Sequence, residues 1–463
     1  MVFPIVGGTQ DTSYEIENSL RFNDDDDARL TRSVSGNLSK AHTFSLWIKR
    51  ANLKASGRHI LAAMGDGSGD ISWLELNNDR IAMLFDGAGN YFPKTDAVLR
   101  DSSAWYHIVV TVDSTQGTAS NRCKFYLNGT QLTDTSGTNP PQDHQAAMDA
   151  CTIGYNSGDE FDGYMAEFHF LDGVAYDPTY FGKTNENGVW IPKKYTGGNY
   201  GTNGFYFEFK QTGTSANSSG MGADTSGNDN HFSATNLAAT DVTVDTPTNN
   251  FATLNPLSAK TLTFSEGNLH ATNDGAAGSA TGTIAPTNGK WYFEITLSGS
   301  ANFAAGVVNL DDWASGTDIY SYGEAAAVLI ESNANYNVTY GNTASSPSTL
   351  QTGTQLLNAT YGFAMNIDNN DLYVSANGNW YTGSAFDNTS FSSASAVTTD
   401  LPSNVPLTAF IRNPDSGTAQ CNFGNPAISI SSGNSDANGY GNFEYAVPSG
   451  YFALCTKNLA EFG

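Results

Sequence analysis

Aromatic side chains beside Asn and Asp in two segments, 311–322 and 377–381, are the residues best suited to hold a ligand. Aromatic rings stack on the faces of sugar rings, and a few convergent polar groups fix the orientation of a ligand. These residue types predict a glycan-binding surface, and the alternative is that the same rings cap a hydrophobic core. The candidate residues are Trp313, Tyr320, Tyr322, Trp380 and Tyr381.

Sequence motifs for covalent and phosphate chemistry are missing from the chain. Its seven His residues form no HxxxH or HxH pair, and no Gly-x-Ser-x-Gly elbow occurs. Gly182-Lys183-Thr184 ends like a phosphate-binding loop, but Asp177 stands where the first Gly of that motif belongs. Ser-His-Asp sets that assemble only in space stay open. Because these motifs are missing, we expect no catalytic residues.

Two acidic segments, 24–27 and 64–70, offer the oxygen ligands that calcium prefers. Neither has the spacing of an EF-hand, and a solvated acidic turn is the other interpretation of each. We expect no metal and no cofactor, with a structural calcium ion as the open alternative.

The charge balance narrows the class of partner. The chain of 463 residues has 21 Lys and Arg against 46 Asp and Glu, for a formal net charge of −25. A surface so poor in cations does not neutralise phosphates, so nucleic acid and anionic membranes are excluded as expected partners. No apolar run approaches the ~18 residues that span a bilayer, and the first residues lack the basic region of a signal peptide. These features predict synthesis in a cytoplasm.

Short strand patterns separated by Gly, Asn, Asp and Ser recur along the whole chain. In the segment 107–112, apolar residues alternate between two faces, as they do in a strand of a sandwich. We predict an all-β protein with two antiparallel β-sandwich domains of jelly-roll type in tandem. The expected division is an N-terminal docking arm at 1–18, a first domain at 19–244, a linker at 245–258 and a second domain at 259–463.

Residues 19–195 resemble laminin-G-like, concanavalin-A-like domains. The resemblance is carried by WYHIVVTVDSTQGTASNRCKFYLNGTQL at 105–132, FSLWIKR at 44–50 and FDGYMAEFHFLDGVAYDPTYF at 161–181. That fold hosts lectins, adhesion modules and glucanases, and glucanases need two carboxylates across one cleft. The nearest acids are Glu160, Asp162 and Glu167. Glu167 has the opposite parity to the other two, so without a bulge it points to the other face.

The second half is similar to a SPRY domain, a binding module without catalytic residues. It has GKWYFEITLSG at 289–299, TYGFAMNIDNNDLYVSANGNWY at 360–381 and PLTAFIRNPDSGTAQCNFG at 406–424. With VDTPTNNFATLNPL at 244–257 and PSGYFALCTKNL at 448–459, the whole chain resembles virion structural or tail-fibre-like proteins of marine tailed bacteriophages. The resemblance implies a protein made in the host cytoplasm and carried on the virion.

These observations together favour a non-enzymatic virion protein, a tail or capsid fibre, spike or decoration. It would contact host-surface glycans or neighbouring virion proteins, as a homo-oligomer. A polysaccharide depolymerase and an architectural adaptor without a host ligand are the alternatives.

We expect the arm to dock on another virion protein or a sister chain through Phe3, Pro4 and Ile5, because unanchored termini are usually disordered. The four cysteines are expected to stay reduced.

Overall fold

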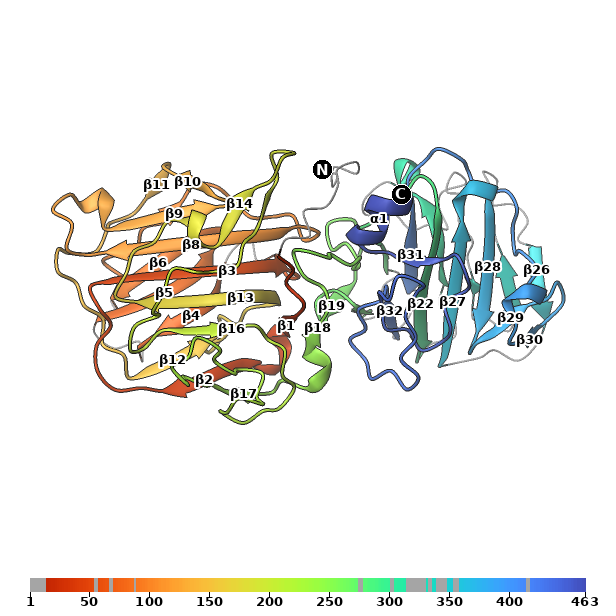
Figure 1. Cartoon of the computed structure of the whole chain (residues 1–463). Coiled ribbons are helices and arrows are strands. Elements are labelled where there is room, and N and C mark those ends of the chain that lie inside the picture. The colour runs from red at the N-terminus through yellow and green to blue at the C-terminus, as the bar shows by residue number, and fades with distance from the viewer. Residues whose placement is uncertain are drawn as a thin grey trace. The chain divides into compact units, whose positions relative to one another are not determined.

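The computed structural model describes residues 14–53, 57–65, 70–86, 89–273, 278–299, 304–313, 330–331, 335–338, 348–352, 358–413 and 417–463. The chain divides into two compact units, with Asp11–Thr248 in the N-terminal unit and Asn249–Gly463 in the C-terminal unit. Both units consist almost wholly of antiparallel sheets (Figure 1), which confirms the predicted all-β class and the two β-sandwiches.

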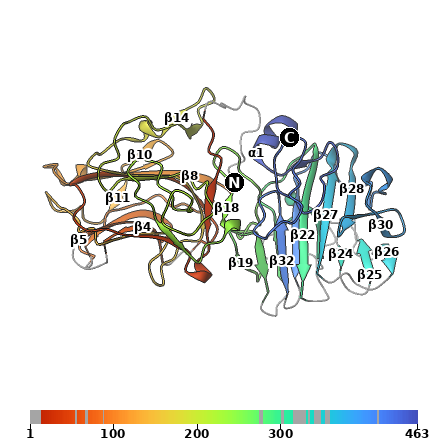
Figure 2. The same ribbon diagram turned by 60° about the horizontal axis from the view of Figure 1, so that its bottom comes forward.

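Two large sheets form the N-terminal unit over its described residues. The first has the order β10 (Thr130–Leu132), β9 (Cys123–Leu127), β8 (Trp105–Asp113), β3 (Ala41–Arg50), β13 (Gly163–Asp172), β1 (Ser19–Phe22) and β18 (Val242–Thr243), with β16 (Phe205–Phe207) also paired to β13. The second has the order β11 (Thr135–Ser136), β7 (Lys94–Thr95), β6 (Arg80–Asp86), β5 (Asp70–Asn77), β4 (Arg58–Met64), β12 (Ala150–Ile153), β2 (Arg29–Ser33) and β17 (Ser233–Thr235). Figure 2 shows the two layers, β8 in one and β4 and β5 in the other.

The core of this unit lies between the two sheets and follows the predicted alternation. Ile108, Val110 and Val112 of β8 are buried in the cluster that joins the sheets, whereas Val109 lies in a separate cluster on the outer face of the first sheet. A hairpin turn at Asn128-Gly129 links β9 and β10, with φ of 48° and 79° at the two turn residues. Asn-Gly suits this turn because both positions tolerate positive φ.

The outer face of the first sheet is covered by chain segments and not left to solvent. The hairpin of β14 (Gly182–Thr184) and β15 (Trp190–Pro192) brings Trp190 against His107 of β8. Farther along the sheet, Ile16 packs on Trp47 of β3 and Ala166 of β13. Tyr14, Glu15 and Glu17, the neighbours of Ile16, form one wall of the candidate site described below.

The C-terminal unit is a second sandwich in the part of it that the structure describes. Its larger sheet has the order β19 (Thr263–Ser265), β20 (His270–Thr272), β32 (Thr418–Asn422), β22 (Lys290–Ser298), β27 (Ala359–Asn366), β28 (Asp371–Ala376), β29 (Asn379–Tyr381) and β30 (Phe386–Asn388), with β33 (Phe452–Ala453) parallel to β22. The smaller sheet has the order β21 (Gly278–Thr281), β31 (Leu407–Asn413), β23 (Ala304–Asn309) and β24 (Ile330–Glu331). A two-stranded sheet joins β25 (Asn335–Val338) and β26 (Ser348–Thr352), and helix α1 spans Thr456–Phe462.

The structure corrects the predicted linker at 245–258. Asp245 is fully buried in the N-terminal unit, where its carboxylate accepts a hydrogen bond from Lys49 Nζ at 2.8 Å. Phe251 and Leu254 are buried in the C-terminal unit, and Ala252 N donates to Leu454 O at 2.9 Å. A Pro-, Asn- and Thr-rich composition is typical of linkers, but in this protein the segment closes one sandwich and begins the next.

The structure also corrects the predicted docking arm at 1–18, because its described residues, 14–18, belong to the N-terminal unit. Tyr14 and Ile16 pack on the N-terminal unit, and Thr248 Oγ1 bonds to both Ile16 N at 3.2 Å and Ile16 O at 2.9 Å. The proposed anchor, Phe3, Pro4 and Ile5, lies outside the described residues.

Candidate functional site

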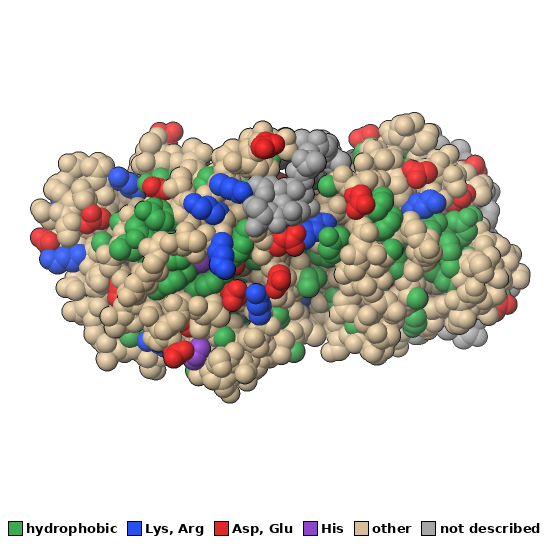
Figure 3. Space-filling view, in the orientation of Figure 1, with side chains coloured by type: hydrophobic (Ala, Val, Ile, Leu, Met, Phe, Trp, Pro, Cys, Tyr) green, Lys and Arg blue, Asp and Glu red, His purple; other side chains and the backbone are tan. Residues whose placement is uncertain are grey.

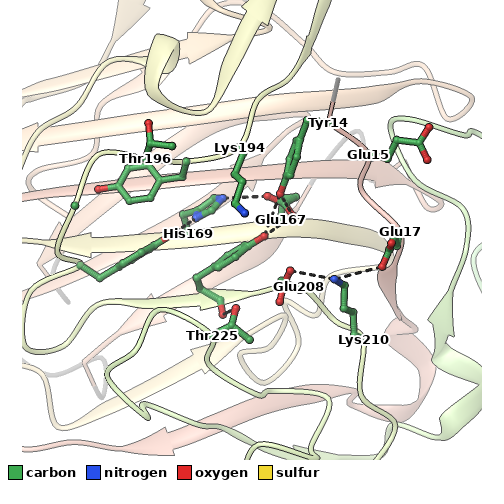
Figure 4. A pocket seen from close by; sticks show the side chains of 14 residues that line it. Tyr14, Glu15, Glu17, Glu167, His169, Lys194, Thr196, Glu208, Lys210 and Thr225 are labelled. Atoms are coloured by element: carbon green, nitrogen blue, oxygen red, sulfur yellow. Dashed lines mark hydrogen bonds and ion pairs between the residues drawn. The ribbon is translucent and has the colours of Figure 1, made fainter. Parts of the chain in front are cut away.

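A pocket of about 610 Å³ opens on the outer face of the first sheet of the N-terminal unit (Figure 4). Residues 14–17, strand β13, the segment 194–200 and the segment 206–210 form its walls, with Thr225 beside them. In Figure 3, basic and acidic side chains lie close together on this face, over the surface where Figure 1 draws β13 and β16. Its lining residues are Tyr14, Glu15, Glu17, Glu167, His169, Lys194, Tyr195, Thr196, Gly198, Tyr200, Tyr206, Glu208, Lys210 and Thr225.

A β-bulge in β13 turns Glu167 toward this pocket. The pairing of β13 with β3 shifts register between Ala166 and His169, and Glu167 has a positive φ of 49°. Met165 and Phe168 both face the core, so the two residues between them lie on the outer face. An extra residue of this kind is how a bulge re-aims a side chain. The bulge reverses the parity expected for Glu167 from an uninterrupted strand.

Hydrogen bonds from three directions hold the Glu167 carboxylate. Its Oε1 accepts from Tyr14 Oη at 2.9 Å and from Tyr206 Oη at 2.5 Å. Its Oε2 lies 3.3 Å from His169 Nε2, and His169 Nδ1 lies 2.8 Å from Tyr200 Oη. The rings of His169 and Tyr206 stack with centroids 4.2 Å apart. The pocket floor is therefore a preorganised network whose members come from four separate chain segments.

The tyrosines of the pocket keep their phenol protons at neutral pH. Burial, followed by the negative charge of Glu167, raises the pKa of Tyr14 and Tyr206. Burial and the neighbouring Tyr195 raise the pKa of Tyr200, and burial with other tyrosines raises the pKa of Tyr195 to about 12. The four lining phenols are therefore uncharged.

A lysine bridge closes one side of the pocket. Lys210 Nζ lies 3.2 Å from Glu208 Oε1 and 3.3 Å from Glu17 Oε2. The exposed Lys194 approaches from the opposite side (Figure 4). Rings, hydroxyls and charged groups together suit a polar ring-shaped ligand such as a sugar, because aromatic faces give area and a few polar groups give orientation.

The two other acids that the sequence placed with Glu167 lie elsewhere. Glu160 accepts a hydrogen bond from Gly158 N at 2.6 Å, inside its own turn. Asp162 is buried before β13 begins, and neither residue lines the pocket. The bulge that would bring Glu167 to their face is present, but the three carboxylates do not share this pocket.

Ser45 and His107 form a Ser-His pair on the outer face of the first sheet. The hydrogen bond between them runs from the imidazole to the hydroxyl, which is opposite to the direction in a catalytic pair. Ser45 Oγ lies 3.0 Å from His107 Nε2, and Trp190 Nε1 donates to His107 Nδ1 at 3.0 Å. Because the indole can only donate, the neutral imidazole carries its proton on Nε2 and donates to Ser45. Burial lowers the pKa of His107 to about 3. His107 therefore offers Ser45 no basic nitrogen.

The structure corrects the expectation that Trp380 and Tyr381 belong to a glycan-binding surface. Their side chains are 4% and 6% exposed. Strand β29 folds back on β28 so that Trp380 packs in a cluster with Tyr292, and the ring of Phe391 crosses it at a centroid distance of 4.8 Å. Covered in this way, these two rings have no free face for a sugar, as the core-capping interpretation predicts.

The other predicted stacking residues are not brought together with them. Trp313 is half-buried, packs on the small cluster of Ala304, Val308 and Phe410, and donates from Nε1 to Ser258 O at 3.4 Å. Tyr320 and Tyr322 lie outside the described residues.

Sequence reasoning missed the pocket because its residues are scattered from position 14 to position 225. The motif at 161–181 contained Glu167, but no local signal marks the bulge that exposes it. The tyrosines at 195, 200 and 206 are a signal that could have pointed to this region.

Metal and thiol chemistry have no assembled site in the part of the chain that the structure describes. No group of three or more His, Cys, Asp or Glu residues is placed to hold a metal ion there. In the first acidic segment, Asp24 accepts a hydrogen bond from Asn52 Nδ2 at 3.1 Å. The second acidic segment lies partly outside the described residues. The four cysteines, Cys123, Cys151, Cys421 and Cys455, are all buried thiols.

Within the described ranges, no helix is long and apolar enough to cross a bilayer.

Comparison with solved structures finds proteins of low sequence identity that cover parts of the chain. The SPRY domain of human HERC1 is 14% identical, with 36% of this chain and 96% of that chain covered at a TM-score of 0.28. A heptameric SAP-like pentraxin from Limulus polyphemus is 15% identical, with coverages of 35% and 79% and a TM-score of 0.28. A Bacteroides ovatus protein for which carbohydrate binding has been suggested is 15% identical, with coverages of 48% and 58% and a TM-score of 0.32.

Comparison at the level of sequence is more selective. No curated protein is significantly similar to the chain. The family model of the Concanavalin A-like lectin/glucanases superfamily matches residues 22–177, within the region where the resemblance predicted such a domain. This part of the chain, which contains the Glu167 bulge, is therefore similar to concanavalin A-like domains.

Proposed function

We propose that the chain is a non-enzymatic virion protein that binds glycans through the tyrosine pocket of its N-terminal unit. The match of residues 22–177 to a superfamily of lectins and glucanases supports glycan binding. The resemblance of the whole chain to structural proteins of tailed bacteriophages supports the virion role. On this proposal the protein is made in the host cytoplasm, reaches the outside on the particle, and contacts other virion proteins and further copies of itself.

The observation that carries the proposal is the preorganised pocket on the concanavalin A-like domain. Four neutral tyrosines surround a carboxylate that two of them already fix in place. A site whose groups are oriented before binding loses little further side-chain entropy when a ligand enters. A sugar is the ligand class that uses both the ring faces and the hydroxyl-sized polar groups.

A glycan array probed with the full-length chain tests the proposal, followed by calorimetry on the best ligand. Tyr195→Ala removes one ring of the lining and should weaken binding at least tenfold. Tyr180→Ala is the matched control, because Tyr180 is an exposed, stacked tyrosine of the same unit that does not line the pocket. The melting temperature of each variant separates lost binding from lost fold.

Each part of the proposal has its own contrary result. Absence of binding to every glycan would refute the glycan-binding function, and equal loss in both variants would refute the pocket as its site. Release of reducing sugar from a bound polysaccharide would show a depolymerase instead. Particles on which electron microscopy finds no copy of the chain would refute the virion role.

A further inference from the structure

The hydrogen-bonding capacity of the pocket is strongly biased toward acceptors. The hydroxyl protons of Tyr14 and Tyr206 are used on Glu167, and the Lys210 ammonium lies between Glu208 and Glu17. A carboxylate has two oxygens with about four acceptor positions and no proton to give. Apart from the Lys194 ammonium and the threonine hydroxyls, the remaining capacity of the lining is the lone pairs of the carboxylates and phenols, which suit a ligand rich in N–H and O–H donors.

The charge of the lining points in the same direction. The lining includes four glutamates (Glu15, Glu17, Glu167, Glu208) against two lysines (Lys194, Lys210). Leaving His169 aside, the difference of four and two is a net charge of −2. The whole chain adds to this potential, since its formal net charge is −25. A carboxylated or sulfated sugar would meet repulsion in this pocket, whereas a cation would be attracted.

The aromatic walls extend this preference. The negative face of a tyrosine ring attracts a cation that approaches within about 6 Å of its centroid. Tyr14, Tyr195, Tyr200 and Tyr206 all contribute to the lining. A protonated amine has three N–H donors and no acceptor, so it matches the carboxylates, the phenol oxygens and the ring faces at once.

We propose that the pocket selects a sugar carrying a free, protonated amino group, an inference that rests on the proposed glycan binding. A neutral N-acetylated sugar offers one amide donor in place of three and no charge. A uronic acid adds a fifth carboxylate to a lining that already holds four. The order of affinity expected from the structure is therefore amino sugar first, N-acetylated sugar second and uronic acid last.

Isothermal titration of the full-length chain with three oligosaccharides of equal length tests this order. The probes are a glucosamine tetramer, its fully N-acetylated counterpart and a galacturonate tetramer. We expect the glucosamine tetramer to bind at least tenfold tighter than the N-acetylated one at low salt. The preference should shrink at high salt, because exposed charges are then screened, and should vanish at a pH that deprotonates the amine.

Two variants and one control assign the preference to the pocket. Glu15→Gln, at an exposed lining position, and Glu167→Gln should each weaken binding of the glucosamine tetramer severalfold more than binding of the N-acetylated tetramer. Glu186→Gln removes an exposed carboxylate of the same unit outside the lining and should change nothing. Since Glu167 is part of the buried network, Glu15→Gln keeps the test valid if Glu167→Gln fails to fold.

The outcomes separate this inference from the proposed function. Equal or tighter binding of the N-acetylated or galacturonate tetramer overturns the amine preference and leaves glycan binding standing. Binding of other glycans on the array but of no amino sugar has the same meaning. Failure of every glycan to bind overturns the proposed function and this inference with it.

Discussion

Removing the charge of Asp245 should destabilise the N-terminal unit strongly. Lys49 and Asp245 form an ion pair at 2.8 Å with side chains only 1% and 0% exposed. The Asp245 carboxylate also accepts from Trp105 Nε1 at 3.1 Å. Asp245→Asn keeps the shape and one of the two acceptor oxygens but removes the negative charge beside the buried Lys49 ammonium.

The expected magnitude follows from burial. Removing one partner of a buried ion pair costs about 3–5 kcal/mol, because the remaining charge stays desolvated. In a unit of about 150–250 residues, each kcal/mol lowers the melting temperature by roughly 2–4 °C. The variant should therefore melt about 6–20 °C lower in the transition of the N-terminal unit.

An exposed pair with the same geometry is the control. Lys40 and Asp143 also lie 2.8 Å apart, but their side chains are 42% and 57% exposed. Exposed pairs are worth about 0–1 kcal/mol, so Asp143→Asn should lower the melting temperature by no more than a few degrees. Scanning calorimetry of the full chain measures both. Equal, small effects of Asp143→Asn and Asp245→Asn would refute the argument from burial.

Three further predictions test packing and protonation. Gly129 and Gly188 share a φ of 79°, but a Cβ at Gly129 would lie 2.4 Å from the Trp190 ring, whereas a Cβ at Gly188 would meet open space. Gly129→Ala should therefore lower the melting temperature more than Gly188→Ala. Equal losses would mean that backbone strain alone matters. Burial lowers the pKa of His107 from 6.5 to about 3, so between these pH values the unfolded chain binds a proton that the folded chain does not. The contribution of His107 to stability should be complete above about pH 6.5 and should fall as the pH drops toward 3. His107→Gln should flatten that slope in urea titrations. Trp380→Ala should cost about 3–5 kcal/mol of stability and leave the affinity for glycans unchanged; weaker binding at an unchanged melting temperature would contradict its core position.

The all-β class and the positions of many strands were predictable from the sequence because their signals are local. Alternation along 107–112 assigns Val110 to the core and Val109 to the outer face, as the structure confirms. The Asn128-Gly129 turn defines a hairpin by the φ angles that its two residues tolerate. The motif at 161–181 likewise indicated the concanavalin A-like domain that the family model matches.

Features that depend on distant partners were not predictable in the same way. Composition made 245–258 look like a linker, because nothing near Asp245 in sequence reveals that its carboxylate meets Lys49, 196 residues away. Trp380 follows a turn and so looked exposed, but whether a ring is covered depends on chain that returns later, in this case Phe391.

The pocket is the clearest case of a feature that only the tertiary structure decided. Tyr14 lies 153 residues from Glu167, and Tyr206 lies 39 residues from it. The bulge that aims Glu167 at both arises from the register of β13 against β3 and not from any residue type that favours a bulge. Sequence by itself determined that a concanavalin A-like sheet would form. Long-range pairing decided which of its acids faces a ring of tyrosines, because register is a property of two strands together.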